Sequence, residues 1–168
     1  LKVYQIPEGN KASKGRAIQN VLNIDADDKV NAFVHVKQLQ DAEFNQSHFL
    51  VFCTKQGVIK KTSLEAYSRP RQNGVNAITI REDDQVIEVL LTSGNDEILM
   101  ANRNGRAIRF NEEKVREMGR TATGVRGMTL DEDDLTDEVI GMIAVPQNSK
   151  DNILVVSELG YGKRSDLE

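Results

Sequence analysis

One pattern occurs three times along this chain, and it constrains the fold more than any other feature. Residues 48–61, 96–109 and 151–164 each contain an apolar run, a polar turn that closes on a glycine, and a second run that ends in a basic residue. The turn glycines Gly57, Gly105 and Gly160 are 48 and 55 residues apart. Repeats of this length are typical of solenoids, propellers and other arrays. The approximate repeats are residues 1–47, 48–94, 95–150 and an incomplete 151–168.

Each repeat has the pattern of four short strands. Around Gly105 we expect them at residues 86–91, 98–101, 106–110 and 125–130, because these apolar runs are bounded by Gly, Asn and Asp. Asn104-Gly105 is a pair favoured in type I′ hairpins. A helical array would need longer runs of 3.6 periodicity. The expected fold is all-β, a propeller-like array of four-stranded antiparallel blades. About three blades are represented, fewer than a closed propeller has, so we expect a partial ring with exposed strand edges.

Charge is sorted along the chain. The formal net charge is −4, which by itself argues against nucleic-acid binding. However, acids gather in turns at 25–28, 82–84 and 131–134, whereas bases gather in the hairpins and the loops after them. Local patches set the field that a polyanion meets, so the distribution matters more than the sum.

Composition places the chain in the reducing cytoplasm. It has a single cysteine, which excludes an internal disulfide, and no apolar run approaches the roughly 18 residues of a membrane span. The first residue, Leu1, begins a strand-like run, so we expect a piece of a longer protein.

No catalytic or metal-binding constellation is predicted. His48 occupies the slot of Asp96 and Asp151 at a strand entry, and Cys53 occupies the slot of a small core residue. The acidic turn at 131–134 begins like a calcium loop, but Thr136 stands where such a loop requires glycine. We interpret the acidic turns as solvated.

The basic residues carry the functional signal. They recur in the second strand of each hairpin and in the loops that follow, so they are expected to line one rim of the arc. A basic rim neutralises phosphates without reading bases, as architectural DNA-binding proteins do. Lysine and arginine also protect strand edges from pairing, and charge alone does not separate the two explanations. The candidate phosphate contacts are Lys60, Lys61, Arg69, Arg71, Arg106, Arg109, Arg120, Arg126, Lys163 and Arg164.

Six stretches favour the DNA explanation. The chain resembles the C-terminal domain of the bacterial DNA gyrase A protein along essentially its whole length, with motifs in the family's order. The motifs are KVYQIP at 2–7, GRAIQN at 15–20, GVIKKT at 57–62, LTSG at 91–94, TGVRG at 123–127 and GYGKR at 160–164.

The resemblance implies a β-pinwheel, a propeller-like ring whose blades exchange strands, that wraps DNA on a basic rim. It implies two partners, duplex DNA and the gyrase holoenzyme, formed by the rest of gyrase A and by gyrase B. That holoenzyme is an ATP-hydrolysing type IIA topoisomerase that introduces negative supercoils. Its catalytic tyrosine, ATP and Mg²⁺ sites belong to other parts, so this piece is expected to hold no catalytic residue and no cofactor.

One departure limits what the resemblance implies. The family's basic signature box is absent, and residues 69–74 are a degenerate version of it in a later blade. The box itself is expected upstream of Leu1.

Three alternatives remain open. The equivalent domain of topoisomerase IV has a more degenerate ring, so the regular repeats favour gyrase. A propeller-like protein-interaction module would expose an apolar or aromatic patch, which the 5% aromatic content supplies poorly. A carbohydrate-processing propeller would need paired carboxylates in a central pocket, whereas the acids here lie in turns.

Overall fold

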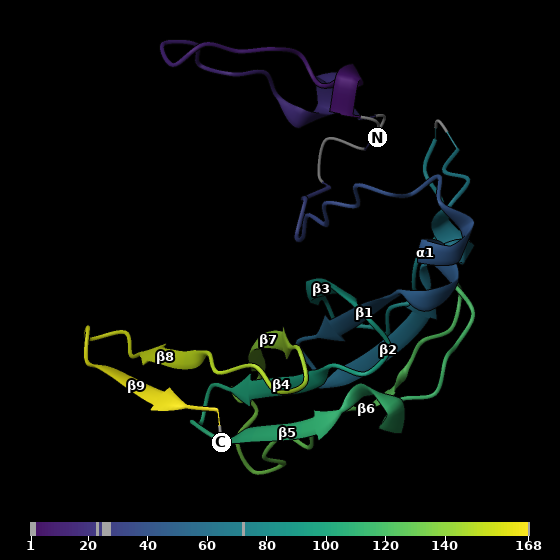
Figure 1. Ribbon diagram of the computed structural model, residues 1–168. Coiled ribbons are helices and arrows are strands. Elements are labelled where there is room, and N and C mark those ends of the chain that lie inside the picture. Colours follow the sequence, from purple (N-terminus) through teal and green to yellow (C-terminus); the bar gives the residue numbers. More distant parts are fainter. Residues whose placement is uncertain (1–2, 23, 25–27, 72, 168) are drawn as a thin grey trace.

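The computed structural model describes residues 3–22, 24, 28–71 and 73–167, and its regular structure is mostly β (Figure 1). The expected all-β class is confirmed. One short helix, α1, occurs, and four 3₁₀ turns accompany the strands. The strands are β1 (Phe49–Thr54), β2 (Val58–Ser63), β3 (Val86–Thr92), β4 (Glu97–Asn102), β5 (Ala107–Asn111), β6 (Val125–Arg126), β7 (Val139–Val145), β8 (Asn152–Val156) and β9 (Gly162–Asp166). The helix is α1 (Ala42–Ser47), and the turns are η1 (Val3–Gln5), η2 (Ile18–Asn20), η3 (Leu64–Tyr67) and η4 (Glu112–Lys114).

The strands form three antiparallel sheets, one for each hairpin. Sheet A has the order β3-β1-β2-β6, sheet B the order β5-β4-β7, and sheet C consists of β8 and β9. Sheets A and B repeat the same design, because β3 and β7 pair with the first hairpin strand in each. Both pairings shift register at the same place, after Cys53 in β1 and after Ala101 in β4. The repeat seen in the sequence is therefore a repeat of sheet topology.

Two expected strands lie in a different sheet from the one assigned by the sequence. Residues 86–91 and 125–130 were expected beside the hairpin around Gly105, but β3 and β6 both complete sheet A. The exchange of β6 depends on close backbone approach: a Cβ on Gly124 would lie 2.6 Å from the carbonyl oxygen of Ile59. A strand of one repeat thus completes the sheet of the repeat before it, as the expected exchange of strands between blades requires.

The hairpin turns differ from the expected type I′. Asn104 keeps a negative φ, whereas Gly105 has φ +79° and donates its N–H to the carbonyl of Asn102. Gly57 and Gly160 repeat this geometry, with φ +79° and +83°. All three turns are three-residue loops whose last residue is a glycine with left-handed backbone geometry. In this type of loop only the last position favours glycine.

The core lies between sheets A and B. Each sheet contributes side chains from alternate strand positions, as sheet packing requires. The expectation that Cys53 is a core residue is confirmed: its thiol is fully buried, and burial raises its pKa to about 12. The buried cluster consists of Val51, Cys53, Ile59, Ile98, Met100, Val115, Met128, Val139 and Met142.

The N-terminal repeat does not form the expected blade. The strand expected at the chain start includes Leu1 and Lys2, which lie outside the described residues, and the following residues Val3–Gln5 form the turn η1. No strand is assigned among described residues 3–22, 24 and 28–47. Figure 1 shows the purple N-terminal part of this segment apart from the sheets, whereas α1 lies beside β2. Helix α1 was not anticipated, although Asp41 caps its N-terminus by accepting from the N–H groups of Glu43 and Phe44. No helix in the described part of the chain has the length and hydropathy needed to cross a membrane.

Candidate nucleic-acid interface

Two of the ten candidate phosphate contacts are buried. Lys60 is 0% exposed and Lys61 is 5% exposed, although both lie on β2 in the hairpin that was expected to face DNA. The expectation that these two lysines contact phosphates is therefore wrong for this structure. Lys61 is buried although Arg109 and Arg164, at the same repeat position, are exposed. The difference arises because the segment after η4 covers β2, where the N–H of Met118 donates to the carbonyl of Lys61.

Lys61 belongs to a buried ion pair. Its Nζ lies 2.9 Å from Oε2 of Glu112, and it also lies over the ring of Phe49, 4.3 Å from the centroid. Glu112 is 0% exposed, and its Oε1 accepts 2.9 Å hydrogen bonds from the N–H groups of Gly94 and Asp96. The pair therefore joins sheet A to the turn that leads into sheet B, and its charge is neutralised internally.

Lys60 is held between two loops. Its ammonium donates to the carbonyl oxygens of Ala77 and, at 2.6 Å, Arg120, and it lies 4.9 Å from the centroid of the Phe52 ring. Burial lowers the pKa of Lys60 to about 8, and the charge of Arg120 adds to this shift. The Lys60 ammonium therefore binds backbone carbonyl groups inside the protein and is not presented at the surface.

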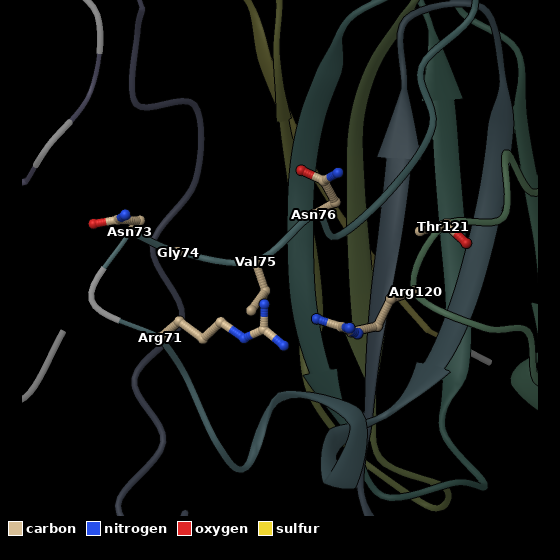
Figure 2. Close-up of a pocket in the computed structure, with 7 residues that line it drawn as sticks. All are labelled: Arg71, Asn73, Gly74, Val75, Asn76, Arg120 and Thr121. Atoms are coloured by element: carbon tan, nitrogen blue, oxygen red, sulfur yellow. The ribbon is translucent and has the colours of Figure 1, made fainter.

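Three candidate arginines line two adjoining hollows. Arg69 and Arg71 lie in the loop after η3, and Arg120 lies in the loop before β6, so the arginines come from successive repeats. Two adjoining hollows of about 430 and 650 Å³ share Arg71 and Arg120. Figure 2 shows the guanidinium groups of Arg71 and Arg120 directed toward each other. The smaller hollow is lined by Arg71, Asn73, Gly74, Val75, Asn76, Arg120 and Thr121, and none of these is acidic.

The remaining five candidates are exposed at other places. Arg106 lies 3.6 Å from Asp131, and Arg109 lies 3.2 Å from Glu97 and donates to the carbonyl of Leu167. Exposed ion pairs of this kind contribute little to stability, so exchanging the carboxylate partner of either arginine for a phosphate costs little free energy. Arg126 on β6 and the β9 residues Lys163 and Arg164 are also exposed, but the last two are neighbours on one strand and point to opposite faces.

The acidic turns have a structural role that the sequence interpretation missed. Asp84 accepts the N–H of Gln56 at 3.0 Å, and Asp137 accepts the N–H of Asn104 at 3.3 Å. Both acids therefore hold the tip of a hairpin. The signal was present: each acid stands two residues before the valine that begins β3 or β7.

Asp134 closes its own turn. It accepts from the backbone N–H and the hydroxyl of Thr136, and these bonds lower its pKa. Among the residues that the structure describes, no group of three His, Cys, Asp or Glu side chains is placed to hold a metal ion.

Comparison with known proteins identifies the repeat. A family model described as the DNA gyrase C-terminal domain, beta-propeller, matches residues 1–37, 48–93, 96–146 and 151–168. The DNA gyrase A protein of Staphylococcus aureus (strain NCTC 8325 / PS 47) is 44% identical over 167 residues, which are 99% of this chain and 18% of that protein. The chain therefore spans less than a fifth of the curated relatives that it matches.

Solved structures agree on the fold. The C-terminal domain of DNA topoisomerase IV superposes with a TM-score of 0.77 at 32% identity, covering 91% of this chain and 45% of that one. The DNA gyrase A C-terminal domain superposes with a TM-score of 0.75 at 24% identity, covering 92% and 48%. The three matched hairpins, the exchanged strand β6 and the superposition make the fold a β-pinwheel, as the resemblance implied. The chain belongs to the family of DNA gyrase C-terminal domains.

Proposed function

We propose that this chain binds duplex DNA through its phosphates, without sequence preference, as part of the C-terminal domain of a gyrase A protein. The observation that carries the proposal is the gathering of Arg69, Arg71 and Arg120 around hollows between two successive repeats. Phosphate contacts from arginine release counterions and carry no base information, so binding should be general and salt-dependent. The other proposed contacts are Arg106, Arg109, Arg126, Lys163 and Arg164.

The wider role follows from the family. In the proposed holoenzyme, this domain bends duplex DNA around its edge, while the rest of gyrase A together with gyrase B supplies cleavage, ATP hydrolysis and Mg²⁺, so that negative supercoils are introduced in the bacterial cytoplasm. No cofactor is proposed for this piece. The 44% identity to a gyrase A protein of Staphylococcus aureus supports gyrase, while among the solved domains that of topoisomerase IV is 32% identical and that of gyrase A 24%.

The test is the binding of a labelled duplex of mixed sequence, followed by fluorescence anisotropy at salt concentrations from about 50 to 200 mM. We expect affinity to fall steeply with salt and to be similar for unrelated sequences. Replacing Arg106 and Arg109 together by Ala should weaken all duplexes equally and lower the salt slope by about 0.9 for each lost phosphate contact.

The matched control is Lys150→Ala, an exposed lysine before β8 that is not a proposed contact. It should leave the salt slope unchanged. A loss confined to certain sequences would contradict phosphate binding. Absence of binding at the lowest salt would contradict the proposal as a whole.

One observation bears on the protein-interaction alternative. Sheet C exposes apolar side chains, with Leu154, Val155 and Val156 at 60–66% exposure. The fold itself explains this exposure, because among the described residues no strand pairs with β8 as β3 pairs with β1. DNA binding therefore remains the function that the site supports best.

A further inference from the structure

The buried ammonium of Lys60 joins two loops that belong to different repeats. One acceptor, the carbonyl of Ala77, follows the loop that carries Arg71, and the other is the carbonyl of Arg120 itself. Because Lys60 is 0% exposed, its ammonium does not contact solvent and cannot touch a bound duplex directly. Burying an ammonium is unfavourable unless acceptors surround it, and here the acceptors are the two loops.

Two further side chains strengthen the same connection. The hydroxyl of Thr79 donates to the carbonyl of Thr121 at 2.7 Å, and its N–H donates to the carbonyl of Ala122 at 3.3 Å. The hydroxyl of Tyr67 donates to the carbonyl of Ala77 at 3.2 Å. These hydrogen bonds therefore hold together the two loops whose arginines line the hollow.

The smaller hollow carries positive charge with no acidic residue in its lining, whereas Glu65 lines the larger hollow beside it. Among the ion pairs within the described residues, none involves Arg71 or Arg120, although their guanidinium groups face each other (Figure 2). Two like charges directed into one space repel unless an anion lies between them. A phosphate offers acceptor oxygens to both forks at once, which is the geometry that arginine favours.

We propose that Arg71 and Arg120 form a clamp for one backbone phosphate of duplex DNA, and that Lys60 is the positioning residue that holds the two halves of the clamp together. The proposal rests on the DNA binding proposed above. It assigns to Lys60 an indirect role, since the lysine sets the position of the arginines and does not touch the duplex.

The experiment is a mutant cycle on duplex affinity and salt slope. Replacing Arg71 and Arg120 together by Ala should lower the affinity roughly eightfold at 0.1 M salt and the slope by about 0.9, as the loss of one phosphate contact predicts, and each single replacement should have a smaller effect. Lys60→Met keeps the length of the side chain and removes the charge. It should weaken binding in the unaltered chain and have no further effect when Arg71 and Arg120 are already Ala.

Folding is checked by the circular dichroism spectrum and the urea midpoint of each variant. If Lys60→Met does not fold, Thr79→Val removes a weaker tie between the same loops and is judged by the same criterion. Lys150→Ala serves again as the control for a lost surface charge.

The outcomes separate this inference from the proposed function. If Lys60→Met weakens binding equally with and without the two arginines, Lys60 does not act through them and the positioning role is wrong. If the two arginine variants bind normally while the Arg106 and Arg109 double variant binds weakly, the clamp is wrong and DNA binding stands. If the unaltered chain does not bind duplex at low salt, the proposed function fails first.

Discussion

At the scale of the residue, the buried pair of Lys61 and Glu112 is the contact whose loss has the clearest consequence. Glu112→Ala leaves the Lys61 ammonium buried without its partner and removes the acceptor of the Gly94 and Asp96 N–H groups. Breaking one partner of a buried pair costs about 3–5 kcal/mol, because the other charge stays desolvated. We expect a decrease of that size in the free energy of unfolding measured by urea.

The neighbouring residue supplies the control. Glu113 is exposed at the same 3₁₀ turn, so Glu113→Ala should change the free energy of unfolding by less than about 0.5 kcal/mol. Equal effects of the two variants would mean that the turn tolerates the loss of any acid and that the pair is unimportant.

The same residues show where sequence interpretation stops. Lys61, Arg109 and Arg164 occupy one slot of the repeat, which correctly places them on the second hairpin strand. Their exposure differs because a later segment covers β2. The backbone of Glu117 forms an isolated parallel β-bridge with Lys61, and the N–H of Met118 donates to the carbonyl of Lys61. A repeat pattern predicts the strand position of a charge, whereas its burial depends on contacts from another repeat.

At the scale of the element, the hairpin glycines provide a matched pair of variants. Gly57 and Gly105 share a φ of +79°, so alanine at either position is strained by about 1–2 kcal/mol. A methyl group on Gly57 would also overlap the carbonyl oxygen of Met128, whereas Gly105 has open space. Gly57→Ala should therefore lower the free energy of unfolding by clearly more than Gly105→Ala.

The measurement is the urea midpoint of both variants. The N–H groups of Gly127 and Met128, just after β6, both donate to the carbonyl of Gly57, so Gly57→Ala should also increase hydrogen exchange at these two amides. Equal destabilisation by the two variants would show that the positive φ alone matters and that the close approach of Met128 relaxes without cost.

The strands themselves were largely predictable, and their partners were not. Alternating or aliphatic runs bounded by Gly, Asn and Asp located β3, β4 and β5 within one or two residues. Pairing is a long-range property: β6 joins β2 across more than sixty residues, and only the small glycines at 124 and 127 indicate a close approach. The strand expected at the chain start is the opposite case, since Val3–Gln5 form the turn η1.

At the scale of the whole molecule, the three sheets differ in their number of strands. We expect the local stability of a sheet to increase with the number of strands paired in it. In sheet A, β1 is paired on both sides and Val51 is 1% exposed, whereas in sheet C the hairpin of β8 and β9 has no other strand among the described residues and Leu154 is 66% exposed. An isolated two-stranded hairpin is marginally stable in water, because it buries little apolar surface.

Native-state hydrogen exchange measures this difference directly. We expect the β1 amides to exchange only through opening near the global free energy of unfolding, and the β8 and β9 amides through local opening of about 0–2 kcal/mol. Repeating the measurement at lower protein concentration shows where any slow exchange in sheet C comes from. Strand pairing between two copies weakens as the protein is diluted, whereas pairing within one chain does not. Strong protection of β8 that persists on dilution would contradict the assignment of sheet C as a free hairpin, and protection that disappears would show that its open edge pairs with a second copy.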